Sequence, residues 1–235
     1  MKKLLSLVPV YLFGMFIAVC VLLLRVLEIW KIKGVQNFPT RAQKGDRGLI
    51  IVSNHPSLLE PIALLALCAH WYVFTLKYGP WNIAETKNFR RGLFRLMEPR
   101  LLFVDRKSKL SRFSVLRQAT ELLQGGAIFL LFPEGGRTSS VSSEQLIVAK
   151  NGARIRSFEV GAGFLAIKTK AMVVPVWVEG TDKVSPNRSD ARYSSLFRFW
   201  KPVTVTIGKP VIFAEGVTAE QATRYLEKTV LDLAT

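Results

Sequence analysis

The spacing of apolar and polar residues predicts strands that alternate with helices behind an apolar N-terminal segment. Uninterrupted apolar runs are typical of strands buried on both faces, and they lie at residues 49–52, 127–132 and 173–178. A short strand is also expected at residues 71–76, and the alternation at residues 203–207 indicates another. Helical patterns occupy residues 62–70, 110–123, 161–168 and a C-terminal stretch that opens with a capping box, Thr218 to Gln221. The order predicts an α/β fold with a mixed sheet flanked by helices.

The N-terminal segment carries no charge between residues 4 and 24. As a helix of about 21 residues it would be about 32 Å long, against a bilayer hydrocarbon core of roughly 30 Å. A secretory signal peptide is the alternative, but the run is long for one and no small-residue cleavage site closes it before Arg25. We expect residues 1–34 to anchor the protein in a membrane, as one helix or as a hairpin continuing through Trp30. Residues 35–235 are expected to form one globular domain.

The stretch from Ser53 to Pro61 carries the first candidate chemistry, because it holds one of two histidines directly after a predicted strand. His55 and Glu60 are five positions apart and would face different sides of one helix. They can meet if His55 lies on the turn after the strand, where Pro56 disfavours helix, and Glu60 lies in the first turn of the next helix. An imidazole oriented by an acid can act as a general base. Alternatively, Glu60 only caps a helix that begins near Ser57, although an N-cap nearer Leu59 suits Pro61 better.

A second loop follows the predicted strand at residues 127–132 and reads Pro133, Glu134, Gly135, Gly136, Arg137. An arginine on a glycine-rich turn can grip a phosphate with two parallel hydrogen bonds. The glycines let backbone N–H groups approach such a ligand closely. The alternative is an ordinary turn with an Arg–Glu ion pair.

Together the two loops resemble the glycerolipid acyltransferase family, which includes the lysophosphatidic acid acyltransferases. The resemblance rests on Asn54-His55 with an acid five residues after the histidine, then Phe-Pro-Glu-Gly-x-Arg ending at Arg137. Two weaker blocks follow the family order, at residues 102–106 and 173–176. The chain departs from the family pattern in carrying Glu60 for the usual Asp and Gly136 for the usual Thr.

The resemblance implies a fold like that of the glycerol-3-phosphate acyltransferases, and it makes residues 35–235 an acyltransferase domain. It implies catalytic roles for His55 and Glu60, with direct attack on an acyl thioester and no acyl-enzyme. The acyl donor would be acyl-CoA or acyl carrier protein, without a metal or other cofactor. The residues implied to contact the acceptor are Asn54, Arg106, Glu134, Gly135, Gly136, Arg137 and Pro175. Because Pro175 lies inside its apolar run, we also expect that strand to be an edge or bulged strand.

The chain is strongly basic, with a formal net charge of +16. Many of the cations fall in a basic stripe between Lys87 and Arg117. No sequence pattern of a helix-turn-helix, zinc finger or aromatic RNA-binding block accompanies the stripe, so anionic membrane lipid is the expected partner and nucleic acid is not. Two cysteines and two histidines without close spacing give no zinc motif.

The sequence therefore predicts a membrane-bound acyltransferase whose catalytic domain lies on the cytoplasmic face. It would transfer a fatty acyl group to the hydroxyl of a lysophospholipid, with 1-acylglycerol 3-phosphate as the first candidate acceptor. Gly136 keeps open a different lysolipid, such as an aminolipid or glycolipid. A catalytically silent membrane-binding protein on the same fold is the alternative from another functional class.

Overall fold

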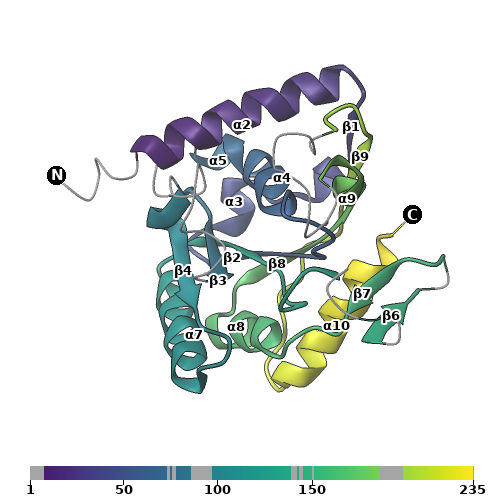
Figure 1. Ribbon diagram of the computed structural model, residues 1–235. Helices are drawn as coiled ribbons and strands as arrows, with labels where there is room; N and C mark the ends of the chain where they lie inside the picture. Colours follow the sequence, from purple (N-terminus) through teal and green to yellow (C-terminus); the bar gives the residue numbers. More distant parts are fainter. Residues whose placement is uncertain are drawn as a thin grey trace.

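A computed structural model of the chain describes residues 8–72, 75, 78–85, 97–138, 142, 145–149, 151–185 and 198–234. Its helices and strands follow one another in the predicted alternating order (Figure 1). The strands are β1 (Trp30–Lys33), β2 (Leu49–Ser53), β3 (Trp81–Glu85), β4 (Leu101–Val104), β5 (Ile128–Leu131), β6 (Leu146–Val148), β7 (Arg154–Arg156), β8 (Met172–Glu179) and β9 (Val203–Ile207). The helices are α2 (Val8–Val26), η1 (Val35–Asn37), α3 (Arg41–Lys44), α4 (Glu60–Leu67), α5 (Ala69–Tyr72), α7 (Lys109–Gln124), α8 (Gly161–Thr169), α9 (Thr181–Val184) and α10 (Ala219–Asp232).

Among the described residues, the main sheet has the strand order β1-β9-β8-β2-β5-β3-β4. Neighbouring strands are parallel except β8 and β9, which are antiparallel, so the predicted mixed sheet is confirmed. Helices α2, α4 and α5 lie on one face, and α7, α8 and α10 lie on the other (Figure 1). A short hairpin, β6 with β7, stands beside the sheet.

Strand β2 shows why the apolar runs predict buried strands. Successive side chains of a strand point to opposite faces. Leu49 and Ile51 pack into the core under α2 and α4, whereas Ile50 and Val52 pack into the core with α7, α8 and α10. All four are fully buried, because helices cover both faces of the sheet.

One prediction about the sheet is wrong. Trp71 and Tyr72 were expected in a strand but belong to helix α5, where Trp71 packs edge-on against Phe38 and Tyr78. A short apolar run does not separate a strand from a buried helix, and the actual next strand, β3, begins at Trp81.

Of the two expectations for strand β8, the edge position is wrong, since β8 lies between β2 and β9. The bulge is confirmed, because the three steps from Val173 to Val176 lie opposite four steps from Val211 back to Ile207. Pro175 is tolerated there because pairing with β9 begins only at Val176, so the missing N–H falls where that ladder is interrupted. The Pro175 carbonyl oxygen still accepts from the N–H of Gly208, at 2.8 Å.

The apolar N-terminal segment forms α2, which lies along the outside of α4 and α5 (Figure 1). Its inner side buries Gly14 and Val21. Its outer side exposes large apolar side chains at helical spacing, namely Val8, Leu12, Phe16, Val19, Leu22, Leu23 and Val26. Among the described residues, α2 is the one helix long and apolar enough to cross a bilayer.

The alternative of a helical hairpin through Trp30 is wrong. After α2 the chain turns through Glu28, which has a φ of 58°. Trp30 then enters β1 and pairs with Val203 of β9. Residues 30–33, expected in the anchoring segment, are therefore part of the sheet.

Candidate active site

The site lies where β2 ends, at the centre of the sheet. Strand β2 pairs in parallel with β5 on one side and β8 on the other, so the carboxyl ends of all three strands meet at one edge. In parallel α/β sheets this edge is where ligands bind. The chain leaves β2 at Ser53 and re-enters helix at Glu60, with Leu59 as the N-cap and Pro61 in the first helical turn. The expected N-cap near Leu59 is confirmed, and Pro61 sits where no intrahelical N–H is needed.

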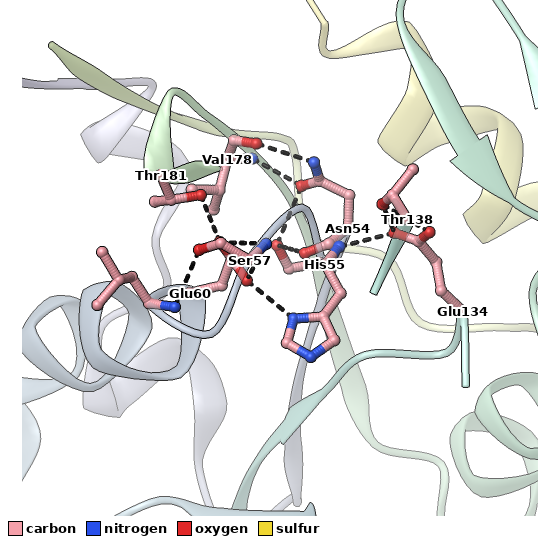
Figure 2. A network of polar contacts seen from close by, with 10 residues as sticks. Asn54, His55, Ser57, Glu60, Glu134, Thr138, Val178 and Thr181 are labelled. Atoms are coloured by element: carbon pink, nitrogen blue, oxygen red, sulfur yellow. Dashed lines mark hydrogen bonds and ion pairs between the residues drawn. The ribbon is translucent and has the colours of Figure 1, made fainter. Parts of the chain in front are cut away.

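The turn brings His55 and Glu60 together (Figure 2). Nδ1 of His55 is 2.8 Å from Oε2 of Glu60. The Glu60 carboxylate is fully buried, whereas the His55 side chain keeps 15% of its surface exposed. An ionised carboxylate can only accept hydrogen bonds, so beside ionised Glu60 a neutral His55 ring carries its hydrogen on Nδ1 and its lone pair on Nε2. Figure 2 shows Nε2 pointing away from the Glu60 network.

Further donors surround the Glu60 carboxylate. The Ser57 N–H lies 3.1 and 3.0 Å from its two oxygens, and the Ser57 hydroxyl donates to Oε1 at 2.7 Å. The hydroxyl of Thr181, in the first residue of α9, also donates to Oε1. The Ser57 hydroxyl accepts in turn from the N–H of Leu59 at 3.1 Å. Ser57 is buried, and its hydroxyl donates to Glu60. It therefore does not point at His55 as a nucleophile would.

The backbone of His55 is held by the second loop. Its N–H donates to Oε1 of Glu134 at 2.6 Å, and its carbonyl accepts from the N–H of Thr138 at 2.9 Å. The other Glu134 oxygen accepts from the N–H of Arg156 at 2.9 Å and from the Thr138 hydroxyl at 2.8 Å. Burial raises the pKa of Glu134 above its ordinary value, and these hydrogen bonds oppose part of the rise. Glu134 thus ties the two predicted loops into one unit.

A cleft of about 510 Å³ opens beside this unit, between β4, α7, α8 and the loop after β5. Phe132 forms part of its wall and also stacks on the His55 ring, with 4.7 Å between the ring centroids. Apolar side chains make up most of the lining, whereas three cations, Arg106, Lys109 and Arg112, line the side toward α7. Gly135, with a φ of 66°, and Glu159 also line the cleft. The cleft can therefore hold a ligand that is both apolar and anionic, and its wall at Phe132 contacts the imidazole.

Comparison with known proteins gives the family. A family model described as Acyltransferase matches residues 30–179, well over half of the chain. The chain belongs to the acyltransferase family. A chloroplastic 1-acyl-sn-glycerol-3-phosphate acyltransferase of Arabidopsis thaliana is 30% identical over 167 residues, which are 68% of this chain and 38% of that protein. One from Brassica napus is 32% identical over 163 residues, which are 68% of this chain and 40% of that protein. The chain spans about two fifths of the length of these curated relatives.

Solved structures include a relative with the same fold. The crystal structure of the 1-acyl-sn-glycerophosphate acyltransferase PlsC from Thermotoga maritima superposes with a TM-score of 0.61 at 25% identity. The superposition covers 86% of this chain and 69% of that one. The resemblance stated from the two loops is therefore confirmed for the family and for the fold.

Three of the residues predicted to contact the acceptor are buried inside this acyltransferase instead. The Asn54 amide is buried, with Nδ2 donating to the Val178 carbonyl at 2.8 Å and Oδ1 accepting from the Val178 N–H at 2.7 Å. It joins β2 to β8 and does not face a substrate. Glu134 is also buried, and both of its oxygens face backbone and Thr138 donors rather than the cleft. Pro175 is buried in β8 beside Val52.

The remaining predicted residues do lie around the site. Arg106 and Gly135 line the cleft. Gly136 and the half-buried Arg137 continue the loop from Gly135 to Thr138, whose N–H holds the His55 carbonyl. Of the basic stripe, residues 86–96 lie outside the described residues, whereas Lys109 and Arg112 line the cleft.

Sequence reasoning missed several contributors: Phe132, Thr138, Thr181 and the cleft positions of Lys109 and Arg112. Phe132 and Thr138 flank the predicted loop in the sequence. That position is a weak signal that they also lie near the site. Nothing in the local sequence marks Thr181, which follows a strand 121 positions beyond Glu60. Among the described residues, no group of three or more His, Cys, Asp or Glu side chains is placed to hold a metal ion.

Proposed function

We propose that this acyltransferase transfers a fatty acyl group from an acyl thioester to the hydroxyl of a lysophospholipid, with 1-acylglycerol 3-phosphate as the first candidate. The product would then be phosphatidic acid. The observation that carries the proposal is the His55 imidazole, held through Nδ1 by a buried carboxylate and placed beside an apolar cleft with cations on one side. The plant and Thermotoga maritima relatives are named as acyltransferases of 1-acylated glycerophosphates, which supports the same acceptor class.

In the proposed reaction Nε2 of His55 takes the proton of the acceptor hydroxyl as that oxygen attacks the thioester carbonyl carbon. Glu60 keeps the other ring hydrogen on Nδ1 and stabilises the imidazolium that forms. The tetrahedral intermediate collapses with cleavage of the carbon–sulfur bond. The proton on Nε2 then passes to the leaving thiolate, so that the imidazole returns to its starting state. A positioned general base of this kind is worth about 10²- to 10⁴-fold in rate.

The cleft supports an acceptor with a phosphate head group. Its apolar wall, including Phe132 and Leu165, would contact hydrocarbon, while Arg106, Lys109 and Arg112 would hold the phosphate. Arg137, on the loop tied to the His55 backbone, would add planar bidentate contacts to the phosphate. Gly136 supplies no hydroxyl at the head group, which keeps an aminolipid or glycolipid acceptor as the second candidate.

We also propose that the protein is held at the membrane by α2, inserted from one face of the bilayer. The helix is long enough to cross, but its inner side packs along α4 and α5. Lying in the plane of the membrane, it could bury its outer apolar face in lipid and still keep these contacts. The remaining cations of the basic stripe would add attraction to anionic lipid. The catalytic domain would face the cytoplasm, where acyl-CoA and acyl carrier protein are available as donors.

The decisive experiment is an acceptor screen with purified protein and a labelled acyl donor. Lysophosphatidic acid, a phosphate-free monoacylglycerol, a lysoaminolipid and a lysoglycolipid would each be offered with acyl-CoA and with acyl carrier protein. We expect labelled phosphatidic acid from the wild type and none from His55→Ala. No product from any pair, together with unchanged lipid turnover in cells carrying His55→Ala, would instead support a silent membrane-binding protein.

A further inference from the structure

Thr181 reaches the catalytic pair from a distant part of the chain. It follows Gly180 at the end of β8, begins α9 and is fully buried. Its hydroxyl donates to Oε1 of Glu60 (Figure 2). Gly180 has a φ of 89°, and a Cβ there would clash with the carbonyl oxygen of Pro202. The backbone before Thr181 is therefore fixed against the segment that leads into β9, which sets the position of the hydroxyl.

The two carboxylate oxygens of Glu60 have different tasks. Oε2 faces His55, whereas Oε1 accepts from the hydroxyls of Ser57 and Thr181. Ser57 lies three residues before Glu60 on the same turn and moves with it. Thr181 belongs to the neighbouring strand–helix connection and fixes Oε1 relative to the sheet.

The hydrogen bond from Thr181 restricts the carboxylate orientation more for a glutamate than it would for an aspartate. Glutamate has one more side-chain torsion, and its last torsion, which turns the carboxylate plane, is broad and weakly restricted. A carboxylate held by Ser57 alone could rotate Oε2 away from Nδ1. A second hydroxyl donor to Oε1, supplied by a different element, restricts that freedom.

We infer that Thr181 is a positioning residue, whose hydroxyl keeps the Glu60 carboxylate turned toward Nδ1 of His55. This inference rests on the proposed function for its kinetic test, but the contact it describes can be measured without turnover. Thr181 does not line the cleft, and its hydroxyl bonds to Glu60, so it acts through Glu60 and not through substrate.

The kinetic test compares Thr181→Val, which keeps the shape and removes the hydroxyl, with Thr181→Ser, which keeps the hydroxyl. A hydrogen bond to a charged group contributes about 1.5–3 kcal/mol. If this contribution is lost from the transition state, kcat should fall about 10- to 100-fold in Thr181→Val. The acceptor KM should change by less than about threefold, because an interaction felt at the reacting centre alters kcat. Thr181→Ser should stay within about threefold of wild type.

A matched control is Thr223→Val in α10. Thr223 is also fully buried, and its hydroxyl bonds to the backbone of Val160, Gly163 and Ala219 rather than to Glu60. It should lower the melting temperature as Thr181→Val does, and it should leave kcat unchanged. If Thr181→Val does not fold, Thr181→Ala removes the same hydroxyl with less crowding and receives the same measurements.

The second readout is the histidine ¹⁵N spectrum of the detergent-solubilised protein. The chain has two histidines, so the spectrum of His55→Ala assigns the signals of His55. In wild type we expect the Nδ1–H tautomer at His55, and in Thr181→Val a mixture of tautomers. A Thr181→Val protein that keeps wild-type kcat and a pure Nδ1–H tautomer would overturn the inference. So would equal kcat losses in the Ser and Val variants, which would indicate packing of the methyl group. If even the wild type shows no acyl transfer, the proposed function fails, while the tautomer measurement still decides the role of Thr181.

Discussion

Replacing Glu60 with glutamine tests the catalytic pair most directly, because the amide has nearly the same shape but a different hydrogen-bond pattern. The carboxylate accepts on both oxygens: from His55 on Oε2, from the Ser57 and Thr181 hydroxyls on Oε1, and from the Ser57 N–H between them. An amide has one accepting oxygen and one donating NH₂ group. It therefore cannot serve both sides of this site.

Two orientations of the amide are possible, and both are unfavourable. If the amide oxygen faces Ser57 and Thr181, the NH₂ group faces Nδ1 of His55, which must then accept. The ring hydrogen moves to Nε2, and the base that would take the substrate proton is lost. If the amide is turned the other way, NH₂ opposes the hydroxyls of Ser57 and Thr181, and one donor is left without an acceptor in a fully buried position.

We expect Glu60→Gln to lower kcat by about 10²- to 10⁴-fold, which corresponds to about 2.7–5.5 kcal/mol of transition-state stabilisation. The free energy of unfolding should fall by about 1–3 kcal/mol, since a buried charged acceptor is replaced by a poorer one. The acceptor KM should change little, because Glu60 is buried away from the cleft.

The assay is the initial rate of label transfer from acyl donor to lysophosphatidic acid, over a range of acceptor concentrations, with circular dichroism to check folding. Glu121→Gln on α7 is the matched control, because Glu121 is exposed and pairs with Arg117 away from the site. Activity near the wild-type level in folded Glu60→Gln would remove Glu60 from the mechanism. A loss expressed only as a higher KM would give it a binding role instead.

Three further changes test other parts of the molecule. Arg137→Lys should raise the KM of a phosphate-bearing acceptor about tenfold, because a point charge replaces a planar fork, and equal losses with a phosphate-free acceptor would make Arg137 structural. Leu12→Gln with Phe16→Gln, on the outer face of α2, should let the protein wash off membranes in high salt, whereas wild type and the exposed α10 control Tyr225→Gln should need detergent. Wild type released by salt alone would contradict the anchor. Because burial raises the pKa of Glu134, its ionisation destabilises the fold as pH rises above the ordinary value of 4.5. The stability of wild type relative to Glu134→Gln should therefore decline through that range, and a difference independent of pH, measured by denaturant unfolding, would contradict this.

The sequence by itself determined the central strands and the meeting of His55 with Glu60. Strand β2 could be predicted because helices cover both faces of the sheet, so its residues from Leu49 to Val52 must all be apolar. The meeting of His55 and Glu60 could be predicted because both lie within one short turn, where Pro56 disfavours helix at His55 and the helix begins at Glu60. Local geometry alone brings such a pair within reach of each other.

Only the tertiary structure decided which polar groups hold that pair and which face a ligand. Asn54 and Glu134 belong to the loops that carry the chemistry, yet their side chains bond to Val178, to backbone and to Thr138, because buried polar groups must find partners wherever the packing brings them. Thr181 contacts Glu60 because β8 pairs with β2 and ends at the same edge of the sheet, a neighbour relation that no spacing in the sequence encodes. Pro175 lies in an inner strand for the same reason. Packing of the whole sheet sets the strand order, whereas a local sequence pattern depends only on residues that are neighbours in the chain.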